Sequence, residues 1–173
     1  SLGLAPVRAE DHYFLTQMLS RIEAIPLEAP PAGVDSSCST LPESLDTVDR
    51  RLGVNAGVLI CLSALRRYVM GDASQDRDAT GEEIEAMQGV IRDGMAAGAL
   101  GLSFNRNPAH FDMEGRLVPG SVAPISELLS LAEALRDLDV GILQCGAAYP
   151  LEISERLRTR LSQVSRRPMV YNQ

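Results

Sequence analysis

Several polar side chains follow a short apolar run of the kind that forms a buried strand. The run covers residues 99–104, and the polar residues at or just beyond its end are Ser103, Asn105, Arg106 and His110. An imidazole can donate, accept or transfer a proton, and a guanidinium can hold a carboxylate through two parallel hydrogen bonds. The spacing predicts His110 as a catalytic residue and the other three as substrate-binding residues.

Three more polar residues occupy equivalent places after other apolar runs. They are Arg66, Gln144 and Asn172, and we expect them to bind substrate too, because ligands of parallel α/β proteins lie at the carboxyl ends of the strands. A structural interpretation stays open. His110 would then be a solvated loop residue, Arg106 would pair with Asp112 or Glu114, and Arg66 would form an ion pair within the fold.

The cysteines and histidines give no pattern of metal ligands or of an activated thiol. Cys38, Cys61 and Cys145 are far apart, with no C-x-x-C spacing, and only two histidines are present. Two of the cysteines, Cys61 and Cys145, lie inside apolar runs and are expected to be buried thiols. We therefore expect no metal on this chain, and a reducing, cytoplasmic setting.

The elements that position these residues are short strands alternating with helices. Nearly continuous apolar runs, which are typical of strands buried on both faces, cover residues 54–62, 99–104, 140–145 and 168–171, with a strand end at residues 2–7. Helices are expected over residues 11–21 and 42–51, and from Thr80, whose capping box with Glu83 begins a helix that Gly98 ends. Ser126 is expected to cap the next helix, and the spacing of Ile153, Leu157 and Leu161 indicates another.

Alternation of strand and helix predicts a parallel sheet with right-handed crossovers, in a single α/β unit over residues 1–173. The pattern alone leaves an open doubly wound sheet and a barrel as alternatives. Ser63-Ala64-Leu65-Arg66 follows the first long run in place of a G-x-G-x-x-G fingerprint, which argues against Rossmann-type nucleotide binding.

Composition excludes some partners. The formal charge is −7 and the arginines are scattered among acidic residues, so we expect no nucleic-acid partner. No apolar run is long enough to span a membrane, and no membrane partner is expected. Aromatic residues make up only 4% of the chain, so its core must be aliphatic.

Four segments together resemble one enzyme family, the N-acyl-D-amino-acid deacylases (D-aminoacylase-like enzymes) of the amidohydrolase superfamily. They are residues 4–8 (LAPVR), residues 63–71 (SALRRYVMG), residues 97–103 (AGALGLS) continuing to Arg106, His110 and Val118-Pro119, and residues 167–173 (RPMVYNQ). The segments stand in the family's own order and correspond to the surroundings of its strands two, three, four and six.

The resemblance implies an internal fragment, about strands two to six, of a (β/α)8 TIM-type barrel that hydrolyses carbon–nitrogen bonds other than peptide bonds. The family uses zinc and a metal-activated hydroxide, and its substrates are N-acylated amino acids or similar small compounds. Its His-x-His pair on strand one and its Asp after strand eight correspond to nothing in this chain, and Leu62 stands where its strand-three His is usual.

Two functions follow as expectations. The first is a fragment of such a hydrolase, inactive alone, which associates with itself or its missing half through open sheet edges. The alternative is a non-catalytic α/β module that oligomerises or binds small acidic ligands.

Overall fold

The computed structural model describes residues 3–27, 38–49, 53–146 and 151–171. Its centre is a four-stranded, wholly parallel sheet in the order β1-β2-β3-β4, which is also the order of the strands along the chain. The strands are β1 (Leu59–Cys61), β2 (Gly101–Phe104), β3 (Ile142–Cys145) and β4 (Met169–Tyr171). The predicted α/β class with parallel strands is confirmed.

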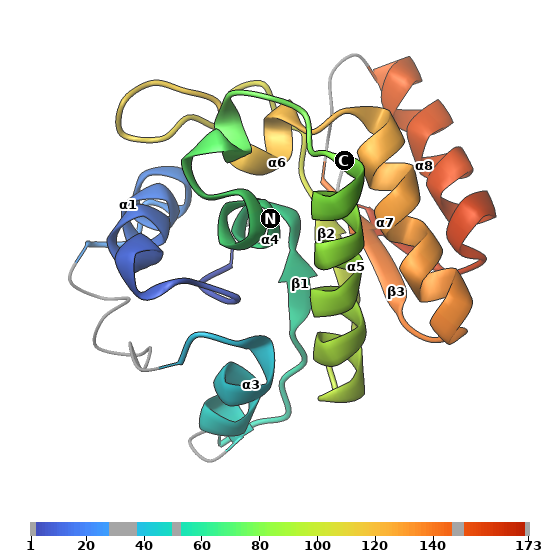
Figure 1. Cartoon of the computed structure of the whole chain (residues 1–173), viewed down its shortest axis with the longest axis horizontal. Coiled ribbons are helices and arrows are strands. Elements are labelled where there is room, and N and C mark those ends of the chain that lie inside the picture. Colours follow the sequence, from blue (N-terminus) through green and yellow to red (C-terminus); the bar gives the residue numbers. More distant parts are fainter. Residues whose placement is uncertain (1–2, 28–37, 50–52, 147–150, 172–173) are drawn as a thin grey trace.

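Helices connect and flank the strands. They are α1 (His12–Glu23), α3 (Leu41–Asp49), α4 (Leu62–Met70), α5 (Gly81–Ala96), α6 (Pro119–Val122), α7 (Ile125–Leu138) and α8 (Leu151–Ser165), with 3-10 turns η1 (Ala9–Asp11) and η2 (Gly71–Gln75). The crossover helices α5, α7 and α8 lie side by side on one side of the sheet (Figure 1). None of the helices in the described part of the chain is long and apolar enough to cross a membrane.

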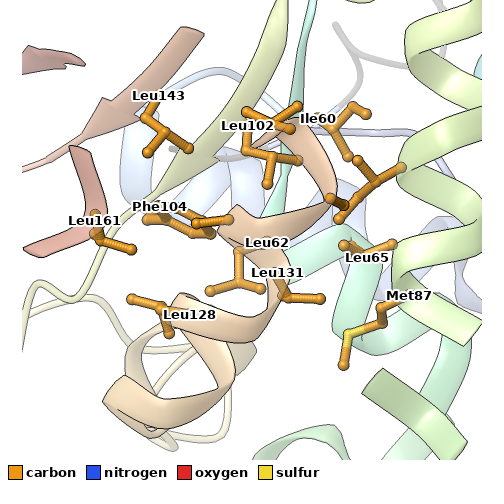
Figure 2. Packing of buried hydrophobic residues seen from close by; sticks show 14 of the residues in the cluster. Ile60, Leu62, Leu65, Met87, Leu102, Phe104, Leu128, Leu131, Leu143 and Leu161 are labelled. Atoms are coloured by element: carbon orange, nitrogen blue, oxygen red, sulfur yellow. The ribbon is translucent and has the colours of Figure 1, made fainter. Parts of the chain in front are cut away.

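The main core lies between the sheet and these three helices. Ile60, Leu102 and Leu143 occupy matching positions on β1, β2 and β3 and are at most 1% exposed. They pack with Phe104 and with aliphatic side chains of the helices, including Met87, Leu128, Leu131 and Leu161 (Figure 2). The low aromatic content is thus matched by an aliphatic core.

The opposite face of the sheet has a different character. Side chains alternate along a strand, so the register places Cys61, Ser103, Gln144 and Val170 in one row across it. Cys61 and Ser103 are buried, Gln144 is half-buried, and Val170 is 49% exposed. Val7, Leu15 and Met18 of the N-terminal segment form a second apolar cluster with Cys61. Exposure of this row therefore increases toward β4.

Most predicted elements are present, and two details were wrong. The Thr80–Glu83 capping box forms, and Gly98 follows the end of α5 with φ of 104°. Ser126 does not cap α7, which begins at Ile125 after an extended Pro124 that makes no side-chain cap. Residues 3–7 form no strand, because Pro6 has no N–H to donate to a sheet.

The ends of strand β1 also differ from the predicted run, which covered residues 54–62. The segment 53–57 is exposed and contains two glycines, and strand β1 forms only from Leu59. At its other end, Leu62 is already the first residue of α4.

Candidate functional site

The carboxyl ends of β2 and β3 bring two predicted site residues together. The hydroxyl of Ser103 donates a hydrogen bond of 2.6 Å to Oε1 of Gln144 on the neighbouring strand. This bond orients the amide, because the oxygen of Gln144 is engaged and its nitrogen is left to donate elsewhere. The pair is a neutral polar group on the face of the sheet away from α5 and α7.

Asn105 lies two residues after Ser103, so its side chain is on the same face of the sheet. Across from it lies Gly146, whose N–H donates to the carbonyl of Phe104 at 2.8 Å. A Cβ atom on residue 146 would lie 3.0 Å from Cγ of Asn105. The missing side chain of Gly146 therefore makes room for the Asn105 amide.

His110 lies between two asparagine amides. Its Nδ1 is 3.2 Å from Nδ2 of Asn105, and its Nε2 is 3.1 Å from Nδ2 of Asn107. Its backbone is also held, since its N–H donates to the carbonyl of Asn107 and its carbonyl accepts from Val118. The structure thus joins His110 directly to Asn105, both predicted site residues, and adds Asn107, which was not predicted.

Asn107 is the residue that the sequence interpretation missed. The signal was the spacing Asn-x-Asn-x-x-His, because asparagine amides often bind the backbone two residues further on. Here Oδ1 of Asn105 accepts from the N–H of Asn107 at 3.0 Å, and Oδ1 of Asn107 accepts from the N–H of Ala109 at 2.9 Å.

The loop that carries His110 is anchored to two helical elements at its far end. Gly120 N–H donates to the Ser63 hydroxyl of α4 at 3.0 Å, and Ser121 donates to the carbonyl of Asn107 at the same distance. Gln75 of η2 donates to both Asp112 and the carbonyl of Leu117. Because of these bonds, His110 sits on an ordered support.

Burial governs the ionisation of two groups near this edge. Partial burial lowers the pKa of His110 below its ordinary value of 6.5, and the negative charge of Glu23 acts the other way. Burial raises the pKa of the Cys145 thiol, although the positive charges of Arg158 and Arg106 act to lower it. All three cysteines are buried, as expected for Cys61 and Cys145. Partial burial therefore favours the neutral imidazole of His110, and Cys145 is not an activated nucleophile.

Arg106 does not make the structural ion pair that was the alternative for it. Asp112 and Glu114 both pair with Arg116, at 3.2 and 3.4 Å. Nε of Arg106 is buried and has no hydrogen-bond partner within the described residues. Nε of Arg106 is therefore a donor that no described residue uses.

Arg66 lies apart from this site. It is completely buried, forms an ion pair with Glu127 and donates to the carbonyls of Ser74 and Arg77. This matches the structural interpretation of Arg66, because its donors are used within the fold. Asn172 falls outside the described residues.

The residues near the edge do not fit a zinc ion. Nowhere in the described ranges do three or more His, Cys, Asp or Glu side chains converge as metal ligands. Around His110 the nearest polar partners are amides, which are poor zinc ligands.

Comparison with known proteins identifies no relative. No family model, curated protein or solved structure matches the chain.

Proposed function

We propose that this chain forms part of a (β/α)8 barrel of the N-acyl-D-amino-acid deacylase type, and that its carboxyl edge binds substrate. The observation that carries the proposal is the row of polar groups at the ends of adjacent parallel strands, Ser103 with Gln144 and Asn105 with His110. The strands follow chain order and the crossover helices α5, α7 and α8 lie on one side, which supports a barrel wall; Leu15 and Met18 of α1 pack with Cys61 on the opposite face.

Within this proposal, His110 moves a proton during amide hydrolysis. When the attacking water replaces an asparagine amide at the acceptor nitrogen of the neutral imidazole, that nitrogen takes a proton from the water and returns it to the amine nitrogen as the carbon–nitrogen bond breaks. Arg106 contributes a charge-assisted contact to the substrate carboxylate. The described residues do not fit zinc, so any zinc in a longer protein would be held by residues outside them.

The test compares this chain with a longer protein in which it is joined to the remaining strands of such a barrel. Release of free amine from N-acetyl-D-amino acids is measured for both proteins, with and without a chelator. We expect activity only from the longer protein, and stoichiometric zinc only there. In that protein His110→Ala should lower turnover about 100-fold or more, whereas Arg106→Ala should weaken binding about 10- to 150-fold. An active long protein with unchanged kinetics in both variants would remove these residues from the site.

One observation favours the second function, a non-catalytic module that oligomerises. Val170 and Tyr171 of the outer strand β4 are about half exposed, at 49% and 50%, and β4 has no further strand partner within the described residues. Such an edge can pair with another chain. A longer protein without amidase activity that assembles through β4 would support this alternative.

A further inference from the structure

The contacts of His110 are unusual because both ring nitrogens face hydrogen-bond donors. The amide nitrogens of Asn105 and Asn107 lie 3.2 and 3.1 Å from Nδ1 and Nε2. A carboxamide nitrogen only donates. If an amide were rotated by 180°, its oxygen would face the ring instead. The hydrogen bonds between the amide oxygens and the backbone determine whether this rotation is possible.

Both amides are fixed by the backbone. Oδ1 of Asn105 accepts from the N–H of Asn107, and Oδ1 of Asn107 accepts from the N–H of Ala109. Turning either amide over would direct its NH2 group against a backbone N–H and lose that bond. The two asparagines therefore present NH2 groups to the imidazole.

The imidazole cannot satisfy both of these donors. A neutral ring has one acceptor nitrogen and one N–H, so one amide contact is a hydrogen bond and the other sets N–H against N–H. An imidazolium would set donors against donors on both sides. Whichever tautomer is present, one ring N–H of His110 lies about 3 Å from the NH2 group of an asparagine, so two donors stand side by side and neither accepts from the other.

We propose that this cluster is a binding site for the oxygen of a small carboxylate, which accepts from the ring N–H of His110 and from one asparagine amide together. Asn105, Asn107 and His110 are only partly buried, and Pro108 and Ala109 beside them are exposed, so a small ligand can approach. A carboxylate is favoured over a neutral carbonyl because hydrogen bonds to an ionised acceptor are about twice as strong. The proposal concerns the same cluster as the proposed function and is independent of deacylase activity.

The experiment is an NMR titration of the histidine ring signals, with acetate and acetamide as probes. The His110 signals are assigned by their loss in His110→Gln. In the free protein His110 should titrate below the ordinary value of about 6.5. Acetate should shift its signals saturably and raise its pKa, because an anion at the ring stabilises the protonated form. Acetamide at equal concentration should produce a shift at least about fivefold smaller.

Variants separate the donor arrangement from unspecific anion binding. Asn107→Ala should weaken acetate binding at least about fivefold. Asn107→Asp replaces the donor by an acceptor and a charge, so it should raise the pKa of His110 by about one unit or more and abolish acetate binding. Asn55→Asp makes the same charge change at an exposed residue before β1, at the opposite end of the strands, and should alter neither.

Two results would overturn the proposal. The first is a free protein whose His110 titrates at or above its ordinary value. The second is an acetate shift that does not saturate, or that is the same in Asn107→Ala as in the wild type. Both readouts come from the folded chain and require no turnover, so failure of the deacylase assay does not affect them.

Discussion

Arg66 and Glu127 form an ion pair from which water is excluded, with the two side chains 0% and 1% exposed. The pair ties α4 to α7, and Arg66 also binds two carbonyls around η2. The second oxygen of Glu127, Oε1, is buried without a partner within the described residues. The pair is therefore a structural link between the two helices. Removal of one partner would leave the charge of the other buried without a counter-ion.

Removing one member of this pair should be more harmful than removing both. Arg66→Met should lower the free energy of unfolding by about 3–5 kcal/mol, because Glu127 stays buried and unpaired. In Arg66→Met/Glu127→Leu the loss should be smaller than in either single variant, Arg66→Met or Glu127→Leu. Urea unfolding of the four proteins gives the coupling. Strict additivity would contradict this account of the pair.

Gly101 should tolerate no side chain. Its φ is 149°, and a Cβ atom there would lie 1.9 Å from the carbonyl oxygen of Ile142, in the backbone of the paired strand. Gly101→Ala should therefore destabilise the protein by about 3 kcal/mol or more, measured by thermal or urea unfolding.

Gly98→Ala is the matched control for this substitution. Gly98 also has a positive φ, of 104°, but nothing lies within 4 Å of its added Cβ. We expect a loss of about 1 kcal/mol, from backbone strain alone. Equal losses in the two variants would show that the contact with β3 is unimportant.

Glu83 should stabilise the protein only above acidic pH. Hydrogen bonds from Arg77 and from the backbone of Thr80 lower its pKa from 4.5 to about 2. A lowered folded-state pKa means that the stabilisation is present above about pH 4.5 and is lost as the pH falls toward 2. Glu83→Gln should cost about 1 kcal/mol at pH 7 and almost nothing at pH 2.

The neighbouring Glu82 provides the comparison for Glu83. It lies in the same first turn of α5 and is exposed. Glu82→Gln should change the free energy of unfolding at pH 7 by less than about 0.5 kcal/mol. If the two variants behave alike, the effect belongs to the helix dipole and not to the ion pair of Glu83 with Arg77.

The outer strand β4 should mediate self-association. Val170→Lys places a charge at the exposed edge, where lysine opposes strand pairing. We expect a concentration-dependent sedimentation coefficient for the wild type, and a smaller dependence for the variant. Arg160→Lys, a change at an exposed residue of α8 that keeps the charge, should sediment like the wild type. A wild type that sediments as a monomer at all concentrations would exclude the edge as an interface.

Much of the fold could be predicted from the sequence because its signals are local. The alternation of apolar runs with helical spacing gave the four strands and their parallel class, and the capping box placed the start of α5 at Thr80. The prediction for Ser126 was wrong because the same apolar pattern fits a serine at the N-cap and a serine one residue inside the helix. The apolar periodicity cannot distinguish the two positions, whereas the fixed φ of Pro124 can.

The site was less predictable because its geometry depends on contacts across the sheet. Ser103 and Gln144 meet through the register of β2 with β3, which no local pattern encodes. Arg66 stands at the end of an apolar run like the site residues do, yet α4 begins at once and turns its side chain into the core. Asn107 was missed because its contact with His110, at 3.1 Å, depends on how the loop after β2 folds back on itself.

The order of the strands has a consequence for how the chain folds. Each strand pairs only with the next one along the chain, as Leu59 does with Gly101, Gly101 with Ile142, and Leu143 with Met169. No pairing among the described strands encloses another, so the sheet can grow by adding one strand and its helix at a time. Each added strand then closes a loop of similar length, so the entropy cost of loop closure is divided among several steps. This favours stepwise assembly of the sheet over the simultaneous pairing of strands that are distant in sequence.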